Sequence, residues 1–277
     1  MLGEKMKPTD NGLVLLIKGA GEIASGIAYR AHQEKFRVCL TEIPYPLAVS
    51  RATAFSDAIF DGFMTISQVT AELTPLSIKE IHRVWLKGNI SLVIDPESKI
   101  LRQLKPDVVV DARMLKQTTD TKIDDSGLVI GIGSGFSAGK DVHIVVETND
   151  RQGNLGKLIF KGEAEANTGI PIEVGGLNRE RVVWAPEDGI FTSSLQIGEP
   201  VRAGQEVARV NNVPIRAPLN GHLRGLLRDG VTVTKGTKLV EVDSVSEVES
   251  FYTIREKMWK VGGSVVEAIK QYQEQLK

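Results

Sequence analysis

The stretch VLLIKGAGEIASG, residues 14–26, joins a short apolar run to a glycine-rich turn and then to the beginning of a helical pattern. Val14–Lys18 is typical of a buried strand, and residues 22–34 carry apolar side chains at helical spacing. Glycines in the turn allow the backbone to reverse tightly between the two elements. The stretch therefore predicts the first strand, turn and helix of a sheet with crossover helices.

The alternation of apolar runs with helical stretches continues to about residue 150. Because parallel strands joined by crossover helices produce this pattern, residues 1–150 are predicted to form a Rossmann-like nucleotide-binding domain. A second helix is predicted at residues 75–87, where apolar side chains again follow helical spacing. The predicted strands are Val14–Lys18, Arg37–Thr41, Ile90–Asp95, Asp107–Asp111 and Leu128–Ile132.

A second unit is predicted from residue 151 on, where glycine-punctuated β segments replace the helical stretches. Its residues 185–242 contain a duplication: Ala185-Pro186 returns 32 residues later as Ala217-Pro218, and turn glycines and aliphatic residues return at the same offset. Two copies of one β motif would cover each other's apolar faces. We therefore predict an all-β barrel-sandwich domain over residues 151–245, followed by a C-terminal helical segment at 246–277.

The glycines of the opening stretch resemble a dinucleotide-binding turn, although the third lies five positions after the second. Without side chains, Gly19, Gly21 and Gly26 would let the backbone approach a phosphate at the helix N-terminus, where free N–H groups attract anions. Glu42 ends the second predicted strand, 21 residues after Gly21, where such folds place an acid that binds ribose hydroxyls. The alternative interpretation is a purely structural tight turn.

A second glycine-rich loop follows the last of these predicted strands, at residues 131–140. Ligands of open α/β sheets bind outside the carboxyl ends of the strands, so this loop is expected to face the same crevice. Its exposed backbone donors would hold a second phosphate or another oxyanion. The loop is not a Walker A motif, because Ser134 stands in place of the first glycine, and a flexible connector is the alternative. The residues predicted to bind an anion here are Arg113, Gly133, Gly135, Gly139 and Lys140.

Other chemistry-bearing side chains form no recognisable catalytic set, so no catalytic residue is assigned. The strongest candidates are Asp111, His143 and Glu147. Asp141, His143 and Glu147 would share one strand face, but three mixed ligands without a partner cluster are common by chance, and no metal is predicted. The single cysteine, Cys39, is expected to be buried and inert rather than a sulfur or selenium carrier.

The composition is that of an ordinary globular protein, with 34 Lys and Arg, 35 Asp and Glu, a net charge of -1 and 42% hydrophobic residues. This balance argues against a nucleic-acid partner. The longest aliphatic run, Leu13–Ile17, is far shorter than the roughly 20 residues of a membrane-spanning helix. With no hydrophobic signal region at the start of the sequence, the protein is expected in the cytoplasm.

The duplicated segment is similar to biotinyl- and lipoyl-carrier domains, whose halves read Ala-Pro, a glycine and then Val-x-x-Gly-x-x-Leu. Those carriers present a modified lysine at the hairpin between the halves. Here residues 210–216 read VNNVPIR, and the missing lysine excludes a swinging-arm carrier. We expect this unit to pack on the first domain or to bind a partner. A candidate basic face, with a solvated surface as the alternative, consists of Arg216, His222, Arg224 and Arg228.

Several segments together carry a family resemblance. They are KGAGEIASGIAYRAH, TEIPYPLAVSRATAFSDAIFDG, VVVDARM, IGSGFSAGKDVHIVVETN, NTGIP and IRAPLNGHLRGLLRDGVTVTKG, in chain order. On these segments the chain resembles the accessory protein family of selenium-dependent molybdenum hydroxylases and, more distantly, the accessory factors of xanthine dehydrogenase. The resemblance implies a dinucleotide-fold domain joined to a carrier-like barrel, and a role in maturing or inserting the molybdenum cofactor of a partner hydroxylase.

Two hypotheses of function follow. The first is a cytoplasmic accessory protein that binds a nucleotide-bearing cofactor, such as molybdopterin dinucleotide, and delivers or modifies it at a molybdenum hydroxylase. The second is a free-standing NAD(P)-dependent oxidoreductase with the barrel as an interaction domain. A homo-oligomer is compatible with both hypotheses, and neither involves nucleic acid or a membrane.

Overall fold

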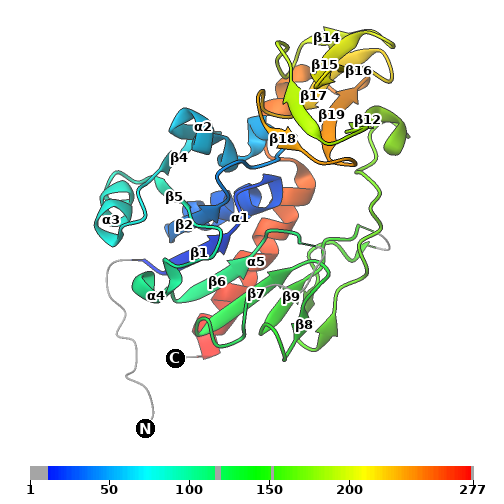
Figure 1. The fold of residues 1–277 in the computed structure, drawn as a ribbon. Helices are drawn as coiled ribbons and strands as arrows, with labels where there is room; N and C mark the ends of the chain where they lie inside the picture. Colours follow the sequence, from blue (N-terminus) through cyan, green and yellow to red (C-terminus); the bar gives the residue numbers. More distant parts are fainter. Residues whose placement is uncertain (1–11, 116–119, 151–152, 276–277) are drawn as a thin grey trace.

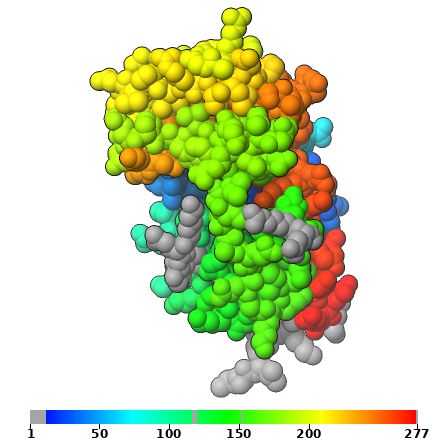
Figure 2. Space-filling view, turned by 90° about the vertical axis from the view of Figure 1, so that its right-hand side faces the viewer, coloured from blue at the N-terminus to red at the C-terminus, as the bar shows by residue number. Residues whose placement is uncertain are grey.

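The computed structural model describes residues 12–115, 120–150 and 153–275 and contains two packed units (Figure 1). The sheet unit, the lower part of the view, is a large sheet covered by helices. The β unit, the upper part, is formed by small antiparallel sheets. Residues 164–181 run from one unit to the other, and Figure 2 shows this segment in light green crossing the boundary between them. Within the described residues, no helix is long and apolar enough to cross a membrane.

The central sheet of the sheet unit has nine strands in the order β10-β9-β7-β6-β1-β2-β5-β4-β3. Neighbouring strands from β4 through β9 pair in parallel, whereas β3 and β10 pair antiparallel at the two edges. A separate small sheet joins β8 to β11. The bounds are β1 Val14–Lys18, β2 Arg37–Glu42, β3 Phe63–Ile66, β4 Val69–Leu73, β5 Ile90–Ile94, β6 Val108–Asp111, β7 Leu128–Ile132, β8 Ser137–Ala138, β9 Ile144–Val146, β10 Leu158–Ile159 and β11 Gly162–Glu163.

The apolar runs of the sequence form the middle of this sheet. β6 and β7 are buried along their whole lengths, because a parallel sheet is covered on both faces. All five predicted strands are confirmed to within a residue or two at their ends. The β3–β4 hairpin was not predicted. It reverses at Ser67 and Gln68, which both have left-handed φ values, 44° and 73°, without a glycine to indicate the turn.

The helices are α1 Glu22–Gln33, α2 Ala58–Asp61, α3 Ile78–Leu86, α4 Leu101–Leu104 and α5 Glu256–Gln275. Short 3₁₀ turns occupy Arg51–Thr53, Phe55–Asp57, Arg179–Arg181 and Val248–Tyr252. The predicted helix at 75–87 is therefore present but shorter. The predicted C-terminal helical segment is present as α5, which returns to the sheet unit and packs beside α1 (Figure 1).

α1 and α5 run parallel, because their contacts advance together along both helices. Glu22 pairs with Arg255 just before α5, at 3.0 Å, and Glu34 pairs with Lys270 near its far end, at 2.8 Å. Between these pairs the backbones approach closely at two glycines. A Cβ on Gly26 would lie 2.7 Å from Met258 Cβ, and one on Gly262 would lie 2.6 Å from the Gly26 carbonyl oxygen. The N-termini of both helices consequently lie at the same end of the sheet unit.

The β unit contains two four-stranded antiparallel sheets, in the orders β12-β19-β17-β14 and β16-β15-β13-β18. The duplication is confirmed, because β13, β14 and β15 begin 32 residues before β17, β18 and β19. Each sheet contains strands from both copies, which explains why neither copy would form its sheet alone. The bounds are β12 Val182–Trp184, β13 Gly189–Thr192, β14 Pro200–Val201, β15 Glu206–Val210, β16 Val213–Arg216, β17 Gly221–Leu226, β18 Thr232–Val233 and β19 Lys238–Asp243.

The predicted fold class needs correction. We expected a Rossmann-like parallel sheet followed by a biotinyl- or lipoyl-carrier-like barrel-sandwich. The central sheet is instead a large, mostly parallel sheet of nine strands with antiparallel edges, and small antiparallel sheets accompany it. The antiparallel edges escaped prediction because β3, β4 and β10 are short and partly exposed, and so lack the continuous apolar pattern of a buried strand.

The segment after β2 joins the two units. Val49 belongs to the hydrophobic core of the β unit, and its carbonyl accepts a hydrogen bond from the backbone of Leu226 at 3.0 Å. Arg51 Nε donates a hydrogen bond to the Leu226 carbonyl oxygen at 2.8 Å. Beside it, Arg228 of the β unit binds Asp61 and Asp57 of the sheet unit, with Nη1 distances of 2.8 and 3.2 Å. Backbone hydrogen bonds and ion pairs thus hold the β unit against the sheet unit at the same surface.

A buried charge cluster forms the second connection. Glu241 of β19 is 2% exposed and accepts from Arg181 at 3.3 Å, from Arg255 at 3.0 Å, and from Lys238. Burial alone would raise the pKa of Glu241, but the positive charges of these three side chains hold the pKa well below its usual value. Because Arg255 also binds Glu22 of α1, Glu241 links the β unit to the N-termini of both long helices.

Candidate functional site

The predicted glycine turn after β1 has the expected shape, but two of its backbone N–H groups are hydrogen-bonded within the protein. Gly19 has a φ of 99°, and its N–H donates to the Thr41 carbonyl at 2.8 Å. The N–H of Ala20 donates to Glu42 Oε2, also at 2.8 Å. Burial raises the pKa of the Glu42 carboxyl, and hydrogen bonds from Ile43 and Ala20 partly oppose this rise. Glu42, the predicted ribose ligand, therefore binds the turn itself.

The other two glycines of the turn have different surroundings. A Cβ on Gly21 would have nothing within 4 Å, so this position at the start of α1 is open. Gly26 instead faces α5, where it allows close contact with Met258. Gly26 is therefore a helix-packing residue in this fold, and the structure does not place it at an anion site.

Arg113 is held in a compact charge cluster rather than left free for a ligand. Its guanidinium binds Asp111 through Nε at 3.0 Å and Nη2 at 2.6 Å, and binds Asp120 at 2.5 Å. Lys18, which is 1% exposed, donates to Thr121 at 2.9 Å and lies 3.5 Å from Asp120 and from Asp125. The cations at the carboxyl ends of β1 and β6 are thus neutralised by acids from the following loop.

The second glycine loop connects β7 to β9 through β8. Gly133, with a φ of 73°, fits between Thr148 and Met114, and a Cβ there would lie 2.9 Å from Thr148 Oγ1. Gly135 and Gly139 also have left-handed φ values, 103° and 85°. Lys140 is exposed, and its backbone N–H donates to the Ser137 carbonyl at 3.2 Å. Binding of an anion by these loop residues together with the first turn stays a prediction.

Asp141, His143 and Glu147 each bind backbone nearby rather than a common ion. Asp141 accepts from Ser137 N, and His143 Nδ1 lies 3.0 Å from Val129 N. Burial lowers the pKa of His143, which favours the neutral ring that accepts this bond. Glu147 accepts from three backbone N–H groups, those of Thr148, Asn149 and Glu165. In the described ranges no group of three or more His, Cys, Asp or Glu side chains is placed to hold a metal.

Cys39 lies in the middle of β2 and is fully buried. Burial raises the pKa of its thiol to about 12. We expect no reaction of the native protein with a disulfide reagent such as dithionitrobenzoate at pH 8, and reaction of one thiol per chain after denaturation. Absorbance of the released thionitrobenzoate measures both values, and rapid labelling of the native protein would contradict the buried position.

The predicted basic face of the β unit is divided among separate environments. Arg224 is buried and pairs with Asp243 at 3.3 Å, whereas Arg228 contacts the sheet unit. Arg216 is exposed and donates to the Gly204 carbonyl at 2.9 Å. The hairpin expected to hold a carrier lysine turns at Asn211, with a φ of 50°. These residues form no single basic surface.

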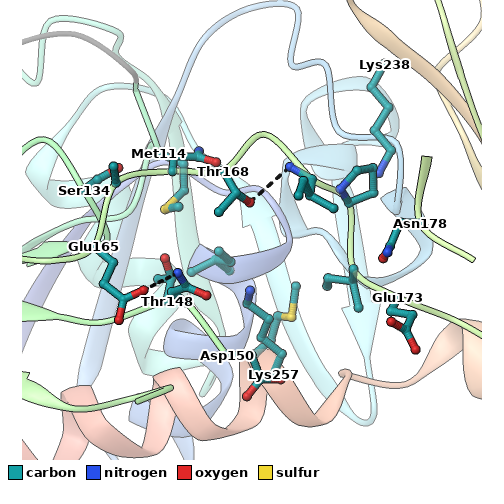
Figure 3. Close-up of a pocket in the computed structure, with 18 residues that line it drawn as sticks. Met114, Ser134, Thr148, Asp150, Glu165, Thr168, Glu173, Asn178, Lys238 and Lys257 are labelled. Carbon is teal, nitrogen blue, oxygen red and sulfur yellow. Dashed lines mark hydrogen bonds between the residues drawn. The ribbon is translucent and has the colours of Figure 1, made fainter. Parts of the chain in front are cut away.

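A pocket that sequence reasoning did not assign lies at the carboxyl edge of the central sheet (Figure 3). Its volume is about 680 Å³, within the usual range for small-molecule sites. Ile23 of α1, Met114 after β6 and Ser134 after β7 line the sheet side. The segment 164–178 forms the opposite wall, and Lys238 of β19 reaches in from the β unit. Both units therefore contribute to one pocket.

Lys257 is one of two lysines in the pocket lining, which also contains the carboxylates of Asp150, Glu165 and Glu173. Lys257 belongs to the first turn of α5, is half-buried, and lies beside Asp150 in Figure 3. Burial lowers the pKa of Lys257, while the negative charges of Asp150, Glu147 and Glu22 oppose this decrease. Among the described residues Lys257 has no hydrogen bond or ion pair, whereas Lys238 in the same pocket binds Glu241. The Lys257 amine is thus available to a ligand.

The remaining polar groups make the pocket rich in hydrogen-bonding capacity. Glu165 accepts from the side-chain amides of Asn149, at 2.6 Å, and of Asn154, at 3.1 Å, which keeps its carboxylate in place. Threonine and asparagine side chains from 148–149 and 164–178 line the same space. The pocket therefore suits a polar ligand. This pocket could not be predicted from the sequence, because its lining comes from distant segments and a lysine in an amphipathic helix belongs to no motif.

Comparisons with known proteins give one close sequence relative. No family model matches the chain. The uncharacterized protein YqeB of Escherichia coli K12 is 39% identical over 269 residues, which is 96% of this chain and 49% of YqeB. The chain thus spans about half the length of the curated relative that it matches.

The similar solved structures include the apo form of the ectoine utilization protein EutE (DoeB) from Ruegeria pomeroyi. It is 12% identical, covers 84% of this chain and 86% of its own, and has a TM-score of 0.24. An aspartoacylase family protein from Mesorhizobium loti is 14% identical, covers 85% and 87% of the two chains, and has a TM-score of 0.27. Likeness at this level does not establish a shared activity.

These comparisons correct the predicted family and function. The similar structures reported are ectoine utilization, aspartoacylase and succinylglutamate desuccinylase proteins rather than molybdenum hydroxylase accessory proteins. The predicted membership of that family, with its molybdenum and selenium chemistry and its cofactor-maturation role, is therefore withdrawn. The alternative, an NAD(P)-dependent oxidoreductase, is equally without support and is withdrawn too.

Proposed function

We propose that this protein binds a small organic anion, a carboxylate or a phosphate compound, in the pocket at the carboxyl edge of the central sheet. The observation that carries the proposal is the half-buried Lys257 amine, which lines the pocket and forms no hydrogen bond or ion pair with the residues described, although the charge of Asp150 acts on it. A charge in such a setting binds an opposite charge more strongly than an exposed lysine does, since less water screens it.

The parallel packing of α1 and α5 supports an anion at this place. Each helix N-terminus carries a partial positive charge of about half a unit and has N–H groups without helical partners. Because the glycine contacts hold the helices side by side, both N-termini point to the end of the sheet unit where the pocket lies. The Glu22 carboxylate offsets part of the positive potential at the N-terminus of α1. The first turn of α5 contributes Lys257 to the pocket wall.

A nucleotide belongs to the proposed ligand class through its phosphates. The predicted nucleotide or dinucleotide ligand, NAD(P) or molybdopterin dinucleotide, accordingly stays a prediction to be tested with the other anions. The cytoplasmic location, a protein partner, a homo-oligomer and the absence of nucleic-acid binding also stay predictions. The near-neutral charge argues against nucleic-acid binding, and the single cysteine is typical of a reducing compartment.

Replacing Lys257 with Ala is expected to weaken anion binding about tenfold or more, because hydrogen bonds to charged groups contribute about 1.5–3 kcal/mol. The thermal midpoint of unfolding would be measured with pyruvate, succinate, pyrophosphate, ATP and NAD⁺, since a ligand that binds only the folded protein raises it. Calorimetric titration of the ligands that raise the midpoint would then give the dissociation constants of both proteins.

Lys260→Ala is the matched control. Lys260 lies one turn further along α5 and pairs with Glu256 at 2.9 Å on the exposed side. This variant is expected to bind every anion as the unmodified protein does. Equal affinity of the Lys257→Ala and unmodified proteins, or no stabilisation by any of the anions, would contradict the proposed function.

A further inference from the structure

Lys257 differs from the other lysines around it in having no acidic partner within the described residues. Lys260 pairs with Glu256 at 2.9 Å, Lys270 pairs with Glu34 at 2.8 Å, and Lys238 binds Glu241. Lys257 lies instead on the pocket wall, near acids of three other positions: Asp150 and Glu147 at the end of β9, and Glu22 at the start of α1. Its amine forms no hydrogen bond or ion pair with these acids, although their charges act on it.

The neutral form of the amine is favoured at Lys257 more than at Lys260. Burial lowers the pKa of Lys257 despite the nearby acids, whereas the hydrogen bond to Glu256 raises the pKa of Lys260. A larger share of Lys257 is therefore unprotonated at a given pH. A neutral amine is a nucleophile, and lysines desolvated in a pocket attack carbonyl groups.

We propose that Lys257 forms an imine with a 2-oxo acid bound in the pocket. The inference rests on the proposed function and deepens it by naming the ligand class. A 2-oxo acid has a carboxylate next to its carbonyl carbon, so the anion that the pocket attracts places the carbonyl beside the lysine Nζ. The iminium that results keeps the positive charge next to that carboxylate, which preserves the ion pair after the bond has formed.

The step is balanced without any further reactant. The Lys257 ammonium gives one proton to Asp150, and the neutral amine adds to the carbonyl carbon to form the C–N bond. The carbonyl oxygen takes up two protons in all, one through Asp150 and one from the nitrogen, and leaves as water. The nitrogen keeps its third proton in the C=N⁺–H group. Asp150 is the carboxylate whose charge acts most strongly on Lys257 and is a proton acceptor of suitable type.

Reductive trapping tests this inference on the full chain. Pyruvate and sodium cyanoborohydride convert an imine to a stable carboxyethyl-lysine, which peptide mass spectrometry assigns to a residue. At pH 7 we expect Lys257 to be modified several-fold faster than Lys260, and acetone, which lacks the carboxylate, to modify Lys257 several-fold more slowly than pyruvate does. Equal modification of Lys257 and Lys260 would overturn the inference.

Two variants separate the imine from anion binding. Lys257→Arg cannot form an imine and is expected to give no carboxyethyl adduct at residue 257, while succinate binding to the Lys257→Ala variant reports anion binding separately. Lys260→Arg is expected to leave modification of Lys257 unchanged. If succinate binding depends on Lys257 but pyruvate leaves no adduct there, the imine is wrong and the proposed function stands. If succinate binding is also independent of Lys257, both are wrong.

Discussion

Replacing Glu241 with Gln is expected to lower the free energy of unfolding by about 3–5 kcal/mol, the usual result of removing one partner from a buried ion cluster. Glutamine has nearly the same shape, so packing is preserved. The loss comes from Arg181, which is 1% exposed, and from Arg255, which is also largely buried. Without the Glu241 carboxylate, these two cations remain close together in a poorly solvated place.

The duplication supplies a control for this prediction. Glu206 on β15 pairs with Arg209 at 2.8 Å, at the positions that correspond to Lys238 and Glu241 in the second copy. This pair is exposed, so Glu206→Gln should change the free energy of unfolding by no more than about 1 kcal/mol. Urea unfolding of both variants measures the difference. Similar small effects in the two would show that the cluster does not hold the units together.

Glu241 also makes the free energy of unfolding depend on pH. Because the pKa of Glu241 is lowered by folding, its stabilising contribution is fully present above the ordinary glutamate pKa of 4.5 and decreases as the pH falls below that value. Unfolding of the unmodified protein should therefore become easier below about pH 4.5, and the Glu241→Gln variant should lose less stability over that range. Parallel acid-dependence curves would indicate that other carboxylates dominate.

Adjacent glycines in α5 should respond to alanine with opposite signs. Gly262→Ala places a methyl group 2.6 Å from the Gly26 carbonyl oxygen, so α1 and α5 must separate, and overpacking of this kind costs about 1–3 kcal/mol. Gly263→Ala meets only the end of the Arg30 side chain, 3.9 Å away. Alanine is about 1 kcal/mol more favourable than glycine inside a helix, so this variant should be more stable than the unmodified protein.

Chemical denaturation followed by circular dichroism compares these variants directly. The two substitutions add the same methyl group to the same helix, so the difference between them isolates the contact with α1. If both variants are stabilised alike, α1 and α5 do not pack through Gly26 and Gly262. The convergence of their N-termini at the pocket would then lose its support.

The buried middle of the fold was predictable because its pattern is local. Each of β1, β2, β5, β6 and β7 is an apolar run bounded by glycine or a charged residue, and the constant offset of the β unit made its duplication visible. The edges of the central sheet were not predictable, because β3 turns at Ser67 and Gln68 without glycine and β10 is only partly buried. The return of α5 to α1 depends on contacts far apart in the sequence.

The candidate site was predictable only in its location. Strand ends of an open sheet predict a crevice at the carboxyl edge, and the pocket lies there. Its residues could not be predicted, because burial and pairing decide which charges are available. Arg113 and Glu42 are of residue types that bind ligands, but in the structure they bind other groups of the protein. Lys257 could be recognised only from the structure, which shows no ion pair for it among the described residues.

The most direct test of the account is a crystal structure with the anion that raises the thermal midpoint most. We predict ligand density in the pocket, with a carboxylate or phosphate oxygen about 2.7–3.2 Å from Lys257 Nζ, or continuous with that atom after trapping of a 2-oxo acid. Density at the glycine turn of residues 19–21 or along the loop of residues 133–140, with the pocket empty, would contradict the account.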